Sequence, residues 1–196
     1  MASPPKLRVL LVNDTGRTVQ ALQCSLIQAG YEVLAEVNGA AALLYAVENL
    51  RPDVIIIDTE SPSLDTLEQL SVMGKAAPHP VIMFAEQGEL PAIRAAVDAG
   101  VTAYVVDTVT PEKLAPIINL AQVRFEDDMR LKARLASAEQ QLADRKAIDK
   151  AKLILMQKRA LSEERAYALL RSQAMEQGLR LADIARQLIN TAKLLG

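Results

Sequence analysis

Pro52-Asp53-Val54-Ile55-Ile56-Ile57-Asp58 sets four consecutive β-branched residues between a turn and an acidic residue. A short apolar run of this composition is typical of a strand that is buried on both faces in the centre of a parallel sheet. The sequence predicts four further strands, at residues 7–12, 31–37, 81–84 and 103–106.

Helical patterns fill the spaces between these strands. A first helix is expected over Val19 to Ile27 and ends at Gly30, and others are expected at residues 40–49, 64–75 and 90–99, with a last one starting at Pro111. Five alternations of strand and helix in about 115 residues indicate an α/β fold with a doubly wound parallel sheet. Such sheets bind ligands at the carboxyl ends of their strands, where this sequence places Asp14, Asp58, Ala85 and Asp107.

The composition argues against membrane-spanning and secreted classes of protein. The chain has 196 residues, of which 51% are hydrophobic, which is enough for one full core and a second small one. No apolar run reaches the roughly eighteen residues of a membrane span, and the N-terminal residues lack the pattern of a secretory signal. The single cysteine, Cys24, favours a reducing cytoplasm, and its place in an amphipathic helix predicts a small buried side chain.

The charge is divided unevenly along the chain. Residues 1–120 carry 7 Lys/Arg against 14 Asp/Glu, whereas residues 121–196 carry 15 against 10. From Arg145 onward the net charge is +6. Exposed helices are often rich in lysine, but an acidic front and a basic tail also indicate regulation in front and polyanion binding behind.

A single long helix is expected after the sheet. No glycine, and no proline after Pro116, interrupts the sequence as far as Met156, a stretch of about forty residues that is long for a globular domain. Its apolar residues follow the 4-3-4 spacing of a short coiled-coil seam, at Leu131, Leu135, Ala138 and Leu142. We interpret this segment as a linker helix that also forms a homodimer, the alternative being a solitary solvated helix.

Two more helices are expected in the tail. Ser162 is a candidate N-cap of a helix that runs to Gln177 and ends at Gly178, and residues 181–195 show a clean apolar stripe at helical spacing. These helices and the end of the long one can share a small core, in which we also place Met156 and Met175. The predicted organisation is an α/β domain at 1–118, a linker and coiled-coil helix at 119–143, and a three-helix module at 144–196.

The acidic strand ends point to a specific chemistry. Two carboxylates on neighbouring strands, Asp14 and Asp58, can hold Mg²⁺, and one of them can accept a phosphoryl group. This arrangement resembles the response-regulator receiver domain over residues 6–120, which implies a flavodoxin-like (βα)5 fold. The resemblance places Asp58 on the phosphoacceptor of the phosphorelay and Asp14 on the main metal-binding acid.

The sequence departs from the receiver pattern at four positions. Asn13 stands in place of a second acid, Ala85 in place of a Thr or Ser hydroxyl, Asp107 in place of a lysine, and Thr108 in place of a proline. An aspartate in place of the lysine replaces attraction by repulsion, on the order of a kcal/mol or more at short range. These departures favour a pseudo-receiver that docks a protein partner over a phosphorylation switch.

Basic side chains recur at a helical spacing near the end of the long helix. Residues seven apart lie about 20° apart around a helix, so Arg145, Lys152 and Arg159 form one basic stripe. Such a stripe can contact phosphates. Stacking on bases has less support from the sequence, because Tyr167 is the only aromatic residue after Phe125.

The tail resembles the ANTAR family over about residues 140–196. The matching segments are IDKAKLILM at 148–156, LSEERAY at 161–167, LRSQAM at 170–175 and LADIA at 181–185, with Leu153 in place of the family's usual glycine. ANTAR proteins bind paired hairpins in leader RNA, usually as dimers, and block a terminator. The resemblance and the charge together imply RNA-contact candidates at Lys152, Arg159, Arg171, Gln173 and Arg180.

Three further segments are similar to the NasT group of nitrate-assimilation regulators. They are IDTESP at 57–62, VRFE at 123–126 and KLLG at 193–196. In that group a nitrate-sensing partner, NasS, sequesters the regulator and releases it when nitrate or nitrite binds. The resemblance therefore implies an RNA-binding transcription antiterminator that a sensor protein controls.

Two alternatives belong to other classes of protein. Residues 181–188, LADIARQL, look like the first helix of a helix-turn-helix, which would make the chain a phosphorylation-dependent DNA-binding response regulator, but we expect too little room for a recognition helix before Gly196. We do not expect an enzyme, because the single histidine, His79, lies in a predicted loop and no nucleophile–base pair or phosphate-binding glycine loop is present.

Overall fold

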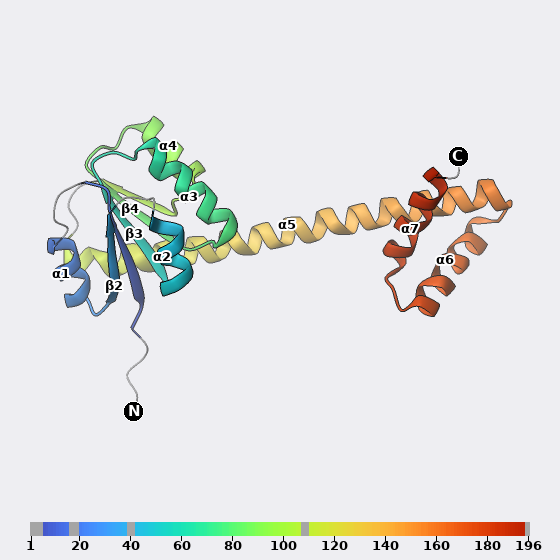
Figure 1. The fold of residues 1–196 in the computed structure, drawn as a ribbon, viewed down its shortest axis with the longest axis horizontal. Helices are drawn as coiled ribbons and strands as arrows, with labels where there is room; N and C mark the ends of the chain where they lie inside the picture. Colours follow the sequence, from blue (N-terminus) through green and yellow to red (C-terminus); the bar gives the residue numbers. More distant parts are fainter. Residues whose placement is uncertain (1–5, 16–19, 39–41, 107–109, 195–196) are drawn as a thin grey trace, which may run out of the picture. The chain divides into compact units, whose positions relative to one another are not determined.

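The computed structural model describes the chain except for residues 1–5, 16–19, 39–41, 107–109 and 195–196. The chain forms two compact units, residues 1–129 and residues 130–196. The first unit contains the sheet and the helices around it, and the second contains a group of three helices (Figure 1).

The first unit is built on one parallel sheet of five strands. The strands are β1 (Arg8–Asn13), β2 (Glu32–Asn38), β3 (Val54–Thr59), β4 (Val81–Ala85) and β5 (Ala103–Val106). Their order in the sheet is β2-β1-β3-β4-β5, with every neighbouring pair parallel. This order confirms the predicted flavodoxin-like α/β fold, and the apolar run at 54–57 forms its central strand.

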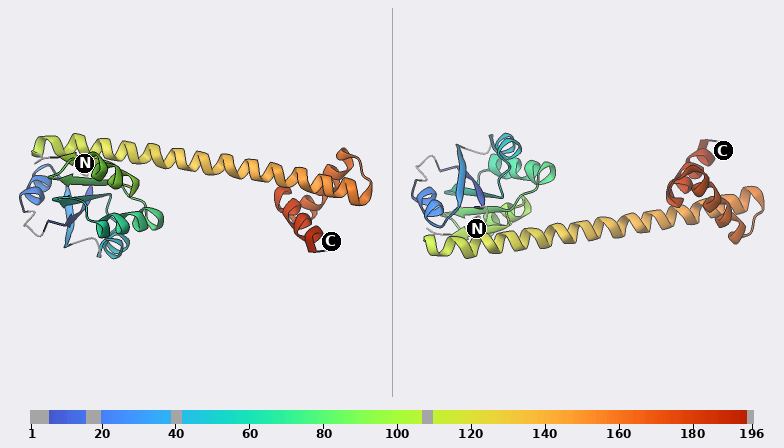
Figure 2. Two further views of the ribbon diagram at one scale, coloured as in Figure 1. Left: turned by 90° about the horizontal axis from the view of Figure 1, so that it is seen from above. Right: turned by 90° about the horizontal axis from the view of Figure 1, so that it is seen from below.

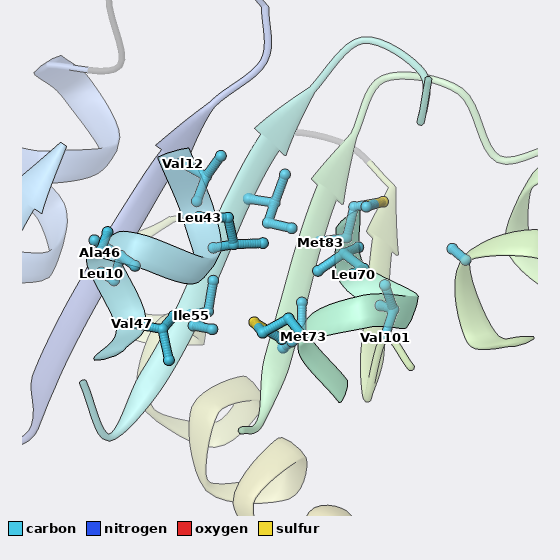
Figure 3. Packing of buried hydrophobic residues seen from close by; sticks show 13 residues of the cluster. Leu10, Val12, Leu43, Ala46, Val47, Ile55, Leu70, Met73, Met83 and Val101 are labelled. Carbon is cyan, nitrogen blue, oxygen red and sulfur yellow. The ribbon is translucent and has the colours of Figure 1, made fainter. Parts of the chain in front are cut away.

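Helices cover both faces of the sheet. On one face lie α2 (Leu43–Leu50), α3 (Leu64–Ala76) and α4 (Leu90–Asp98), whose buried residues pack on the inner side chains of β1, β3 and β4 (Figure 3). On the other face lie α1 (Gln20–Gln28) and the first turns of α5 (Pro111–Arg159), which contribute Leu26, Leu114 and Ile118 to a second core (Figure 2).

Cys24 is exposed, so the prediction of a small buried side chain is wrong. Leu26 is the buried residue of α1. Cys24 and Leu26 are two residues apart, which places their side chains about 200° apart around the helix axis. Cys24 therefore faces away from the sheet when Leu26 faces toward it. A short amphipathic pattern does not define its own buried face, which depends on the sheet against which the helix packs.

The helix α5 confirms the predicted long helix and continues beyond Met156 to Arg159. It spans 49 residues and begins at Pro111, where the fixed backbone angle of proline suits the first helical position. Every residue from Glu126 to Ala143 is exposed. No helix in the described part of the chain combines the length and the apolarity that a membrane crossing requires.

The second unit packs the end of α5 against α6 (Glu163–Gln177) and α7 (Leu181–Leu194). The side chain of Ser162 accepts a hydrogen bond from the backbone N–H of Arg165, and Gly178 ends α6 in the left-handed conformation, as the sequence predicted. Small side chains let the three helices approach closely, since alanine dominates the buried set: Ala147, Ala151, Ala166, Ala174, Ala182 and Ala185.

The two methionines that we placed in this core behave differently. Met156 packs partly buried against the cluster, whereas the side chain of Met175 is 74% exposed. Met175 follows the buried Ala174, and neighbouring residues point about 100° apart on a helix. The prediction of a core position is therefore wrong for Met175.

Candidate functional site

The carboxyl ends of β1 and β3 bring the two predicted acidic residues together. Asn13 pairs with Asp58 in the strand register, and the backbone N–H of Asp14 donates to the carbonyl oxygen of Asp58 over 2.9 Å. Asp14 directly follows the last residue of β1, and Asp58 is the second-last residue of β3 and is less buried than its neighbours in that strand. Asp14 and Asp58 therefore lie side by side at one edge of the sheet.

A hydrogen-bond chain from α3 reaches Asp14. The hydroxyl of Thr66 donates to Oδ2 of Asp14 over 2.7 Å, and its side chain is almost completely buried. The Ser63 hydroxyl lies 2.9 Å from the Thr66 hydroxyl and also caps the helix by accepting from the Thr66 backbone N–H. Since the Thr66 proton points to Asp14, Ser63 must donate to Thr66, and one carboxylate oxygen of Asp14 is already engaged by the protein.

Asn13 organises the backbone next to the pocket. Its Oδ1 atom accepts from the backbone N–H of Thr15 over 3.1 Å and from the Thr15 hydroxyl over 2.9 Å, and its amide nitrogen donates to Glu36 over 3.2 Å. This is the local side-chain-to-backbone bonding that Asn favours in turns. The residue that replaces the second acid thus contributes no negative charge, and its amide oxygen is used within its own turn.

Among the described residues, the acidic donor set of the pocket is smaller than Mg²⁺ usually needs. Receiver domains typically bind Mg²⁺ at their phosphorylation site, and Mg²⁺ prefers several oxygen ligands. Here no three acidic, imidazole or thiol side chains gather into one site within the described residues. Ala85, which is buried and pairs with Thr59, brings no hydroxyl to the pocket. The departures at Asp107 and Thr108 fall outside the described residues.

Lys152 is a largely enclosed member of the predicted RNA contacts. Its ammonium nitrogen lies 2.7 Å from Oε1 of Glu163 and 2.9 Å from Oδ1 of Asp149, and its side chain is 16% exposed. The hydrogen bond with Glu163, and then that with Asp149, raises the pKa of the Lys152 ammonium. This charge bridges α5 to the first turn of α6 and is already balanced by two carboxylates.

Arg180 belongs to a network of four charges between α5 and α7. Its guanidinium donates to both carboxylate oxygens of Asp183, each over 3.1 Å, and lies 3.7 Å from Oδ2 of Asp144. Arg186 donates to the same two aspartates. The bond from Arg186 lowers the pKa of the Asp144 carboxyl, and the bond from Arg180 lowers that of Asp183. The network links α5 to α7, and its two aspartates and two arginines balance each other in charge.

The remaining three candidates differ in burial and in their ion pairs. Gln173 is half-buried and donates to Glu176 over 3.0 Å. Arg159 and Arg171 are exposed, and their guanidinium groups make no ion pair with any other described residue. Among the five predicted contacts, Arg159 and Arg171 are therefore the cations that an incoming phosphate can reach without displacing a carboxylate.

Several residues of these sites were not predicted from the sequence. Ser63 precedes a helix and could have been assigned as its N-cap, but nothing in the sequence links Thr66 to Asp14, 52 residues earlier. Asp149 and Glu163 look like ordinary exposed helix charges until α6 folds back on α5. Contacts between distant segments depend on how the helices pack, which local patterns do not encode.

Known proteins match both units. The response regulator receiver domain matches residues 9–119, and the ANTAR domain matches residues 136–189. The transcriptional regulatory protein PdtaR of Mycobacterium tuberculosis (strain ATCC 25618 / H37Rv) is 26% identical over 184 residues, which cover 94% of this chain and 90% of PdtaR. The chemotaxis protein CheY of Thermotoga maritima is 24% identical over 113 residues, which cover 57% of this chain and 94% of CheY.

The first unit also resembles solved receiver structures. A CheY-like response regulator receiver domain protein from Methanospirillum hungatei JF-1 superposes with a TM-score of 0.54 and 25% identity, covering 63% of this chain and 99% of that one. The sheet order and the paired strand-end acids define a receiver-type signalling domain. The chain belongs to the response regulator receiver domain family, and it carries an ANTAR domain behind the receiver.

Proposed function

We propose that this response regulator is an RNA-binding transcription antiterminator that binds leader-RNA hairpins through its ANTAR domain. The observation that carries the proposal is the ANTAR match at 136–189, over a three-helix unit that exposes Arg159 and Arg171 without internal ion pairs among the described residues. A net charge of +6 from Arg145 onward suits a polyanionic ligand. PdtaR, which covers nearly the whole chain, is a transcriptional regulatory protein.

The receiver acts in this proposal as a docking domain for a partner sensor protein of the NasS type, in nitrate or nitrite assimilation. The pocket supports control by binding more than control by phosphorylation. Asp14 is engaged by Thr66, Asn13 by its own turn, and Ala85 offers no hydroxyl to a phosphoryl group. A partner that binds the free regulator and releases it on a signal needs none of these groups.

The regulator acts as a homodimer through the exposed apolar seam of α5. Leu131, Leu135 and Leu142 are 64%, 59% and 54% exposed. Leu142 and Ala151 are nine residues apart and hence face about opposite sides of the helix. Ala151 is buried against α6 and α7. Pairing through the seam therefore leaves the packed side of the ANTAR unit undisturbed.

Transcription in vitro tests the proposed function. Transcripts bound by the full chain in its own cells are identified by cross-linking and sequencing, and their leaders are placed before a terminator. We expect the added protein to raise read-through by RNA polymerase, and Arg159→Ala with Arg171→Ala to abolish that effect. Read-through that does not respond to the wild-type protein would reject antitermination.

The alternative is a DNA-binding response regulator that phosphorylation activates. The resemblance of residues 181–188 to the first helix of a helix-turn-helix favours it. In the structure this stretch opens α7, and its apolar side is packed into the three-helix core. Tighter binding of promoter duplexes than of leader hairpins, increased by a phosphodonor, would favour the alternative.

A further inference from the structure

An exposed stripe of α6 combines an aromatic ring, a guanidinium group and a thioether. Tyr167 is 43% exposed, Met175 is 74% exposed, and Arg171 between them is exposed as well. Their spacing of four residues puts successive members about one turn apart on the same side of the helix. Ala166, Leu170 and Ala174 of the same helix are buried in the core of the unit, so the stripe is not needed to hold the helix in place.

The stripe is unusual for a solvent-exposed helix. Tyr167 is the only aromatic residue of the second unit, yet it lies outside the core, where a large ring would stabilise most. Met175 likewise exposes an apolar side chain that a core could bury. Single exposed apolar residues are common, but here two of them flank an arginine that no described carboxylate balances.

Resting on the function proposed above, we infer that this stripe is a stacking site for an unpaired nucleobase in the loop of an RNA hairpin. Proteins read single-stranded loops by stacking unpaired bases on aromatic rings and on arginine planes. The Tyr167 ring takes the face of the base, the Arg171 guanidinium reaches the phosphate next to it, and the thioether of Met175 covers a neighbouring base or sugar.

The charge around the stripe favours a nucleic acid as its occupant over an apolar protein surface. The unit carries an excess of cations, and the stripe itself is split by one. An apolar partner would leave the Arg171 guanidinium buried without a counter-ion, which is costly. A nucleotide supplies both a flat apolar face and a negative charge within the reach of one helix turn.

The test uses the full chain and a library of stem–loop RNAs with a constant stem and a randomised loop, from which tight binders are selected. We expect Tyr167→Ala to weaken binding of a selected RNA by about 5- to 150-fold, the range that alanine gives for one stacked base. Tyr167→Phe keeps the ring and should bind like the wild type. Tyr45→Ala, at the 74% exposed tyrosine of α2, is the matched control and should have no effect.

The salt dependence of RNA affinity distinguishes base stacking by Tyr167 from phosphate contact by Arg171. Tyr167→Ala should leave the slope of log affinity against log salt unchanged, because stacking releases no counter-ions, whereas Arg171→Ala should reduce the slope by about 0.7 to 0.9. Replacing the stacked nucleotide by an abasic one should weaken binding to the wild type and leave binding to Tyr167→Ala unaltered.

Two outcomes overturn the inference in different ways. If the wild type selects no stem–loop at all, the proposed function fails and the stacking site fails with it. If the wild type selects hairpins and Tyr167→Ala binds them equally well, the inference alone fails. A change of sedimentation mass in Tyr167→Ala without a change in RNA affinity would assign the stripe to a protein contact instead.

Discussion

The ammonium group of Lys152 lies between two carboxylates and is largely covered. We therefore expect Lys152→Met to lower the melting temperature of the protein and to weaken RNA binding by misplacing α6, with the salt slope of binding unchanged. A lysine that contacted phosphate would reduce that slope by about 0.7 to 0.9 when it is removed. Equilibrium binding at several salt concentrations measures the difference.

Arg165, which lies two residues after Glu163 on α6, provides the control for that experiment. Its side chain is exposed, and its guanidinium is not paired with any described carboxylate. Arg165→Met should leave the melting temperature unchanged. A flatter salt dependence in Lys152→Met, with an unchanged melting temperature, would contradict the positioning role and return Lys152 to the set of direct RNA contacts.

Asp144 makes the stability of the second unit depend on pH. The hydrogen bond from Arg186 holds the pKa of the Asp144 carboxyl below its usual range. A carboxyl with a lowered pKa stabilises the folded state fully above its unfolded value of about 3.9, and this contribution is lost as the pH falls below about 4. Asp144→Asn should therefore melt below the wild type at neutral pH, and the two melting temperatures should converge in acid.

Thermal melts at several pH values followed by circular dichroism provide the measurement for Asp144. Gln141→Asn alters an exposed neighbour on the same helix and should melt like the wild type throughout. A constant gap between wild type and Asp144→Asn from neutral pH to about pH 3 would contradict the shift, since protonation would then not be linked to this contact.

Single residues show where sequence reasoning reaches its limit. Ser162 and Gly178 were assigned correctly because capping depends on a few consecutive residues. Cys24 and Met175 were misplaced because each lies one or two residues from a buried position of its helix, and a shift of that size turns a side chain outward. The pairing of Lys152 with Glu163 needs the fold of two helices before it exists at all.

At the scale of elements, periodicity was a sound guide. The five strands were predicted from apolar runs, and the structure changes their limits by no more than two residues. The long helix was predicted from the absence of breakers, and its predicted start at Pro111 is confirmed. Pro116 does not interrupt it, and it ends at Arg159, beyond the predicted Met156. Boundaries are hard to predict because terminal residues respond to neighbouring loops as much as to their own propensities.

The seam of α5 carries the prediction that belongs to this scale. Leu135→Lys with Leu142→Lys should convert dimers to monomers, because each charge would lie inside the paired helices. Analytical ultracentrifugation measures the mass. The control is Ala133→Lys with Ser137→Lys, which places the same charges on the outer side of the helix and should remain dimeric. A dimer mass for the leucine variant would remove the seam as the contact.

At the scale of the whole molecule, the proposed function assigns sensing to the receiver unit and RNA binding to the ANTAR unit. The acidic receiver offers a reduced phosphorylation pocket, and the basic unit offers exposed arginines. We expect Asp58→Asn to leave antitermination in vitro unchanged, with or without a small phosphodonor, because the sequence has Ala85 in place of a hydroxyl and Asp107 in place of a lysine that would contact the phosphoryl oxygens. A variant that loses antitermination, or a wild type that needs the phosphodonor, would show that Asp58 is the switch.

The most direct measurement is a competition at equilibrium between a labelled leader hairpin and an unlabelled DNA duplex of the same stem sequence, with the full chain at moderate salt. The ANTAR unit should keep the hairpin bound until the duplex is in large excess, and unlabelled hairpin should displace the label at equal concentration. Displacement by the duplex as readily as by the hairpin would show that the protein responds to phosphate charge alone and does not recognise the RNA loop.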